Sequence, residues 1–195
     1  MLARFSGFFV GSVFGLAFVL INSGPPLPPV VSLALRALAV TVAVAIVVLA
    51  LLAMRRDGRN TGGSANEPGE GPVAPRFGAL FRTVTLVEFA LILGGVAALN
   101  SFGAPSQAGV AWVAFIVGLH FFPLGLAWRQ REILHLAWYA TALGAIGLVM
   151  VFAGYPDWVP LVSGVVTGAG MLLGALTALV LMHREAAAPT PERPA

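Results

Sequence analysis

Apolar residues occur along this chain in six long runs, separated by segments rich in Pro, Gly and polar residues. A helix that crosses a bilayer needs about 20 apolar residues in succession. The runs approach or exceed this length at 5–22, 30–54, 80–100, 108–128, 133–153 and 159–182. They predict an all-α, polytopic membrane protein in which six transmembrane helices form one domain over residues 1–183.

The first run also has the charged start of a signal peptide, because Arg4 precedes it. It is longer than the usual apolar core of such a peptide, and no small-x-small cleavage pattern follows it. We therefore expect a retained first helix.

The segments between the runs predict turns and loops. Asn22–Pro29 is rich in proline, which fixes φ and lacks an N–H, so this segment cannot continue either neighbouring helix. The longest polar segment, 55–79, is dominated by Gly, Pro, Ser and Asn and predicts a flexible loop. Residues 184–195 predict a disordered tail.

Arginine placement predicts the orientation. Arg4, the arginines between positions 55 and 82, the pair at Arg129 and Arg131, and those after position 183 would all fall on one side of the membrane. The three turns on the other side contain no Lys or Arg. By the positive-inside rule, both termini and the 55–79 loop are cytoplasmic, and Trp and Tyr near the span ends form an aromatic belt.

Six spans with both ends on one side divide into two triplets of opposite orientation. The pattern V-G-x-x-F occurs at Val10–Phe14 in the first span and again at Val117–Phe121 in the fourth. An inverted repeat of three plus three helices, as in some transporters, would produce this correspondence.

Composition narrows the class of function. Hydrophobic residues make up 58% of the chain and charged residues 10%, which excludes an ordinary soluble domain. The net charge is +3, but the arginines lie beside apolar runs and are not interleaved with aromatics, so we expect no nucleic-acid partner. The absence of Cys excludes disulfides and thiolate metal sites. No H-E-x-x-H, G-x-S-x-G or P-loop motif occurs, so we expect no metal, no cofactor and no catalytic residue.

Three ionisable residues lie inside predicted spans: Arg36, Glu88 and His120. Such groups cost about 2.5–3.5 kcal/mol each at a helix centre unless they are paired, neutralised or hydrated. At a rise of 1.5 Å per residue, Glu88 and His120 lie at the same depth, roughly 12 Å from the cytoplasmic side. Arg36 lies roughly 9 Å from the outer side.

These residues predict a site for a small solute or a proton. A carboxyl and an imidazole that meet in a low-dielectric interior can hold and relay a proton near neutral pH. Pro123 cannot donate to the carbonyl of Leu119, which leaves a free acceptor beside His120. We expect Glu88 and His120 to form the site, with Arg36, Leu119 and Pro123 assisting.

Each charged residue also has a structural interpretation. Arg36 can bond to the carbonyls of the preceding turn or extend to the interface. Glu88 can be a protonated interhelical hydrogen-bonding group, and His120 can be a neutral packing residue.

Glycines predict close helix packing. Gly7, Gly11 and Gly15 recur at intervals of four, and the sixth run carries Gly164 and Gly168. Small residues let helix backbones approach closely in lipid. Packing within the monomer is the favoured interpretation, and a homo-oligomer seam is the alternative. The homo-oligomer alternative gives a rival function, that of a structural or accessory membrane protein that packs on itself or on a partner.

The heptad Gly118–Leu124, G-L-H-F-F-P-L, resembles a G-L-H-F-x-P-L pattern of small, uncharacterised bacterial multi-span membrane proteins. The resemblance matches at His120 and Pro123. It implies a bacterial inner-membrane protein and supplies no substrate.

Overall fold

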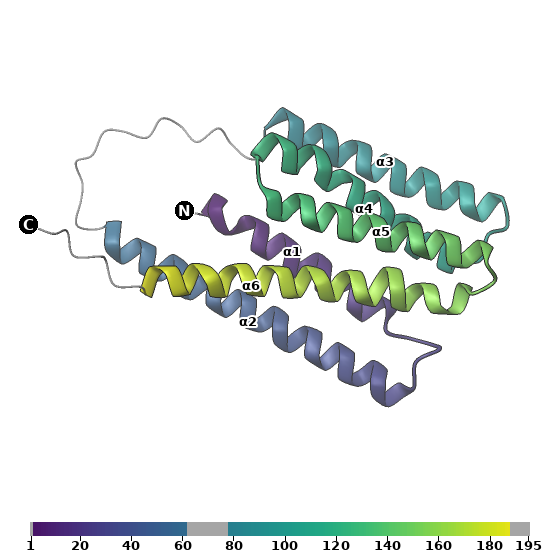
Figure 1. Cartoon of the computed structure of the whole chain (residues 1–195), viewed down its shortest axis with the longest axis horizontal. Coiled ribbons are helices and arrows are strands. Elements are labelled where there is room, and N and C mark those ends of the chain that lie inside the picture. The colour runs from purple at the N-terminus through teal and green to yellow at the C-terminus, as the bar shows by residue number, and fades with distance from the viewer. Residues whose placement is uncertain (1, 62–77, 188–195) are drawn as a thin grey trace, which may run out of the picture.

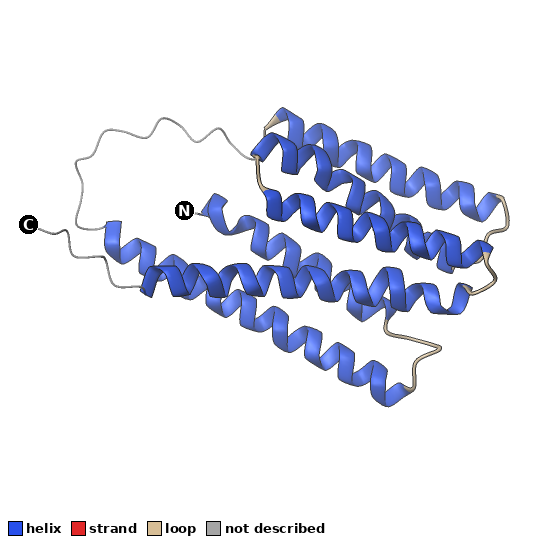
Figure 2. Cartoon of the chain, viewed as in Figure 1, coloured by secondary structure: helices blue, strands red, loops and turns tan. Residues whose placement is uncertain are grey.

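The computed structural model describes residues 2–61 and 78–187, which are helical apart from short turns (Figures 1 and 2). The long helices are α1 (Leu2–Asn22), α2 (Pro29–Thr61), α3 (Ala79–Ser101), α4 (Gln107–Trp128), α5 (Arg131–Phe152) and α6 (Thr167–Ala187). A 3-10 turn, η1 (Pro156–Trp158), and a π-helical segment, η2 (Pro160–Val166), lead into α6.

Among the residues that the structure describes, five helical stretches are long and apolar enough to cross a membrane, and the apolar stretch Phe9–Asn22 of α1 is shorter. The outer surface of the bundle is apolar as well. Leu33, Leu86 and Val149 are each more than 60% exposed, and they are only examples of many exposed large apolar side chains. A soluble monomer rarely exposes so much contiguous apolar surface, whereas lipid accommodates it. The all-helical prediction is confirmed, and the chain has the features of a polytopic membrane protein.

The helices form two groups. In one, α1, α2 and α6 pack around Ile46, Ala50 and Leu179, which are fully buried. In the other, α4 packs extensively on α5, and α3 lies against α4 at the edge of the bundle (Figure 1). The segment η2 contacts helices of both groups, and a smaller cluster that includes Phe18, Val117 and Met171 joins them.

The α4–α5 turn is shorter than the gap of residues 129–132 between the fourth and fifth predicted spans. Arg129 adopts a left-handed conformation (φ 53°) after the end of α4, and Gln130 N–H donates to the carbonyl of Gly125. Arg131 and Glu132 already belong to α5. Because the two helices are joined by so short a turn, they pack as neighbours.

Two predicted boundaries are wrong. The flexible loop was predicted to begin at residue 55, but α2 continues to Thr61, and Arg55 and Arg56 are good helix formers. The disordered tail was predicted to begin at residue 184, but α6 continues through an alanine-rich segment to Ala187. The remainder of both predictions, residues 62–77 and 188–195, lies outside the described residues.

The sixth predicted span is not a uniform α-helix, because η2 interrupts it. Tertiary hydrogen bonds hold this segment. The Tyr139 hydroxyl of α5 donates to the carbonyl of Val166 at 2.6 Å, and Ser163 Oγ donates to the carbonyl of Leu143 at 2.8 Å. Apolar periodicity carries no signal for such a segment, because the interactions that hold it come from another helix.

Candidate functional site

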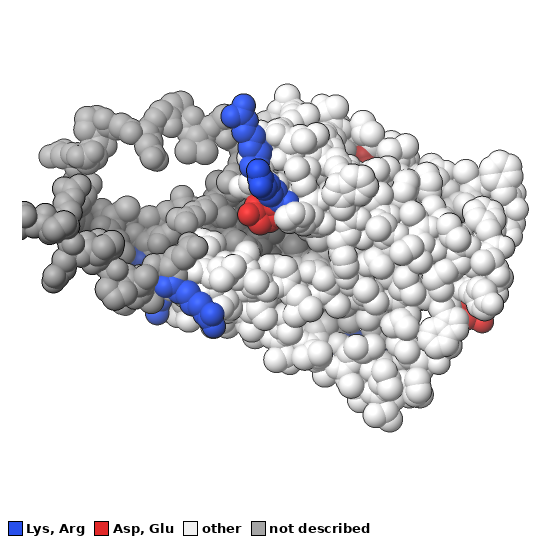
Figure 3. Space-filling model, viewed as in Figure 1, with Lys and Arg blue, Asp and Glu red and all other residues white. Residues whose placement is uncertain are grey.

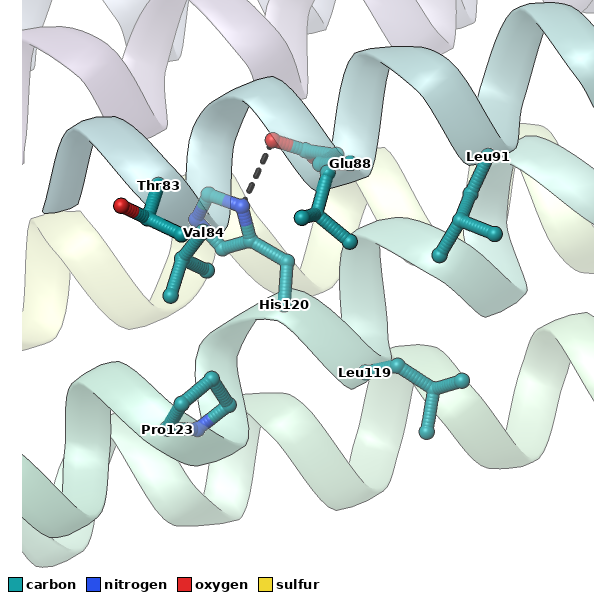
Figure 4. A pocket seen from close by; sticks show the side chains of 8 residues that line it. Thr83, Val84, Glu88, Leu91, Leu119, His120 and Pro123 are labelled. Carbon is teal, nitrogen blue, oxygen red and sulfur yellow. Dashed lines mark ion pairs between the residues drawn. The ribbon is translucent and has the colours of Figure 1, made fainter. Parts of the chain in front are cut away.

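Glu88 of α3 and His120 of α4 meet at the interface of these two helices (Figure 4). His120 Nδ1 lies 2.6 Å from Glu88 Oε2, and the two side chains are 12% and 9% exposed. Glu88 is the one buried residue of α3, a helix otherwise made of half-buried and exposed side chains. Because α3 is apolar and buries only this carboxyl group, the carboxyl group is positioned for a specific partner. That partner is the imidazole of His120.

The pair lies at the wall of a cavity of about 210 Å³. The lining consists of Thr83, Val84, Val87, Glu88, Leu91, Leu119, His120 and Pro123. Val87, Leu91 and Leu119 are each at least 40% exposed, so the cavity opens at the outer surface of α3 and α4. In a membrane this opening faces lipid, roughly 12 Å along α4 from its end at Trp128.

Pro123 lies inside α4, which continues through it to Trp128. Because proline has no N–H, it does not donate to the carbonyl of Leu119, one turn earlier. The side chains of both residues line the cavity. The structure therefore brings together four of the predicted site residues: Glu88, Leu119, His120 and Pro123.

Arg36 is not part of this group. Its guanidinium donates to the carbonyl of Ser23 at 2.7 Å, in the turn between α1 and α2. Figure 1 shows α2 and α3 at opposite edges of the bundle. Of the roles expected for Arg36, the structure shows the bond to a carbonyl of the preceding turn. This bond satisfies an acceptor beside the end of α1.

Two aromatic contacts also hold α3 against α4, and the sequence did not predict them. The Trp112 indole N–H donates to the carbonyl of Leu91 at 2.9 Å, and its ring lies where a side chain on Gly95 would be. Phe81 and Trp128 stack with ring centroids 6.5 Å apart. The available signal was the indole N–H itself, which needs a partner when it lies inside an apolar helix.

Of the predicted packing glycines, Gly15, Gly164 and Gly168 pack against other helices of the monomer, and Gly11 does not. A Cβ on Gly15 would lie 2.9 Å from the carbonyl oxygen of Gly168, and a Cβ on Gly164 would overlap Asn22. Gly11 has no neighbour within 4 Å of that position. Gly7 belongs to α1, but its surroundings lie outside the described side chains.

The other two histidines lie elsewhere. His135 is exposed near the start of α5, and His183 Nδ1 lies 2.9 Å from the carbonyl of Leu179 in α6. Among the described side chains, no three His, Asp or Glu residues lie close enough together to hold a metal ion. The chemistry that the described site offers is thus that of a carboxyl–imidazole pair in an apolar wall.

Comparison with known proteins adds no family: no family model, curated protein or solved structure matches the chain. The resemblance of the heptad around His120 to bacterial membrane proteins stays a prediction.

Proposed function

We propose that this chain is a six-span bacterial inner-membrane protein that binds a small solute and exchanges a proton at the Glu88–His120 pair. The observation that carries the proposal is the 2.6 Å approach of these two side chains at the wall of a cavity, far from either end of their helices. Intramembrane ionisable groups are costly, and those that occur commonly mark ion or substrate pathways.

The proposed topology has both termini in the cytoplasm. Figure 1 shows that α1 begins and α6 ends at the same end of the bundle. In Figure 3 the arginine side chains of the visible face gather toward this end, and the middle of the face carries almost no charge. An arginine-rich end is the cytoplasmic one under the positive-inside rule.

A repeat of three plus three helices is part of this proposal. The third helix of each half packs against the first helix of the other half, since α3 lies on α4 and α6 lies on α1. Such an exchange is what an inverted repeat would produce, and the proposed site would then lie where the two halves meet.

The pair suits proton exchange because it can change its charge by one without moving its helices. A carboxyl and an imidazole are both groups that bind and release protons, and side chains 2.6 Å apart are close enough to pass one between them.

Reconstitution into proteoliposomes tests the proposal through proton uptake and solute flux. We expect His120→Ala and Glu88→Gln to abolish proton uptake, and the exposed His135→Ala to retain it as a matched control. Wild-type uptake in both site variants would refute the proposal.

The rival function is a structural or accessory protein that packs through glycine faces with itself or a partner. The observation in its favour is that Glu88 and His120 also hold the peripheral helix α3 on α4. It predicts that Gly11→Leu, at the glycine with open space beside it, changes the mass of the detergent-solubilised protein. A monomeric wild type with no co-purifying partner would contradict this rival.

A further inference from the structure

Arg36 carries a positive charge on the outer surface of α2. Its side chain is exposed, and its neighbours on the same helix face, Leu33 and Val40, are apolar and 69% and 43% exposed. The guanidinium donates to the carbonyl of Ser23 at 2.7 Å, but a neutral carbonyl does not balance its charge. Among the described side chains, no carboxylate forms an ion pair with Arg36. The described part of the chain thus leaves this charge without a counter-ion.

Two lengths place the guanidinium at the edge of the hydrocarbon. The apolar stretch of α2 ends with Arg55 and Arg56, and Arg36 lies roughly 28 Å before Arg55 at a rise of 1.5 Å per residue. The 21 residues of α1, which end just before Ser23, span about 31 Å by the same rise. The hydrocarbon core of a bilayer is about 30 Å thick. Arg36 and Ser23 therefore meet at the boundary between hydrocarbon and headgroups, at the end of the bundle that holds the α1–α2 turn (Figure 1).

The α1–α2 turn also fixes the direction of the Arg36 side chain. Side chains of an α-helix lean toward its N-terminus, and α2 begins at this turn. Ser23 is fully buried, and its hydroxyl donates to the carbonyl of Val19 at 2.6 Å. Its carbonyl accepts one N–H of the guanidinium, which has five such donors in a planar fork. The remaining donors are held at the boundary and are available to an anion.

From this geometry we infer that Arg36 binds the phosphate of a phospholipid in the leaflet next to the α1–α2 turn. A guanidinium can bind a phosphate through two parallel N–H···O bonds, and its charge balances that of the phosphate. An anionic phospholipid is favoured, because a zwitterionic headgroup already balances its phosphate with an ammonium group. This site is separate from the Glu88–His120 pair and does not depend on the proposed function.

The charges around Arg36 suit a single lipid. The other arginines of the visible face gather at the opposite end of the bundle (Figure 3). At the end with the α1–α2 turn, the described acidic residue is Asp157, which is exposed on η1, and η1 packs on α4 and α5. A phosphate beside α2 is therefore bound by one arginine and meets no described carboxylate of that helix.

The test uses the full chain in an uncharged detergent, with phosphatidylglycerol and phosphatidylcholine of identical acyl chains as probes. Native mass spectrometry counts the bound lipids and gives their dissociation constants. We expect the wild type to prefer phosphatidylglycerol, and Arg36→Gln to weaken the tightest phosphatidylglycerol by about tenfold or more. The glutamine keeps an amide N–H for the Ser23 carbonyl. Arg184→Gln, at an exposed arginine of α6, is the matched control and should retain the tight lipid.

Two glutamate variants of α2 test the site with Arg36 in place. Leu33→Glu adds a carboxylate one turn before Arg36 on the same face, where it pairs with the guanidinium and repels a phosphate. It should lower the affinity for phosphatidylglycerol toward that of Arg36→Gln. Val30→Glu adds the same charge at a 78% exposed position on a different face of the helix, and should lower the affinity less.

Inorganic phosphate distinguishes a lipid site from a site for a soluble anion. We expect an excess of it to leave the lipid bound, because it lacks the acyl chains that lie along the exposed apolar face of α2. Displacement by inorganic phosphate would overturn the inference. So would equal affinities for the two lipids, an equal loss of affinity in Arg36→Gln and Arg184→Gln, or a wild-type affinity in Leu33→Glu.

Discussion

The two sides of α4 form contacts of opposite character. Toward α5, the helix presents Gly118 and Gly125, and a Cβ at Gly118 would overlap Thr141. From α5, Gly144 meets the backbone of Phe115 just as closely. Toward α3, the same helix presents a histidine to a carboxylate, an indole to a backbone carbonyl, and a cavity.

We interpret the α4–α5 contact as the structural scaffold and the α3–α4 contact as the candidate site. Small residues let α4 and α5 approach until backbone atoms touch, and in lipid such packing supplies much of the association energy. The α3–α4 contact is less extensive and includes a carboxyl–imidazole pair and an indole hydrogen bond. We therefore expect the α4–α5 contact to be fixed, and the α3–α4 contact to respond to protonation and ligands.

Gly144→Leu should break the scaffold side and give the largest effect. Its side chain would overlap the backbone of Phe115, which cannot rotate away, so we expect the free energy of unfolding to fall by about 3 kcal/mol or more. Gly94→Leu on α3, where nothing lies within 4 Å, is the matched control and should leave stability near the wild-type value. Unfolding in detergent with increasing denaturant measures both, and equal losses would show that the α4–α5 contact is not specially tight.

The polar side is tested with Glu88→Leu, His120→Leu and the double variant. Each single change leaves a buried polar partner unsatisfied and should cost about 1–3 kcal/mol, whereas the double change removes both groups and should cost less than either. The same unfolding measurement gives the coupling energy. Additive losses in the double variant would mean that the two side chains do not interact.

Trp112→Phe gives the smallest of these effects. It removes the hydrogen bond to the Leu91 carbonyl and keeps most of the ring, so we expect a loss of about 0.5–1.5 kcal/mol. Trp138→Phe, at a position 66% exposed on α5, keeps a ring to pack edge-on against Phe122, so it is the control and should have the smaller effect. A larger loss for Trp138→Phe than for Trp112→Phe would contradict the role given to the indole N–H.

Most of the fold could be predicted from the sequence, because long apolar runs have few structural solutions in lipid. The helix positions were correct within a few residues at most of their ends. The exceptions lie outside hydropathy. The extension of α2 to Thr61 contains Arg55 and Arg56, which favour helix, but also Gly58 and Asn60, which disfavour it, and η2 depends on hydrogen bonds from α5.

The site could be predicted in part. Counting residues along two antiparallel helices placed Glu88 and His120 at the same depth, and they do meet. The same counting could not say which helices are neighbours, so Arg36 was grouped with them although it bonds to Ser23. The hydrogen bond of Trp112 to α3 was not predicted, because a place in the aromatic belt explained a tryptophan near a span end equally well.

Infrared difference spectroscopy of the full chain across a pH jump tests the central claim most directly, because it detects the carboxyl and imidazole groups separately. If Glu88 and His120 act as one site, one carboxyl band and one imidazole band change together, and both are lost in Glu88→Gln and in His120→Phe, while the bands of the other acidic residues and histidines remain. His135→Ala should leave the coupled signal intact. A difference spectrum that is the same as that of the wild type in Glu88→Gln or in His120→Phe would contradict the claim that the two side chains act as one site.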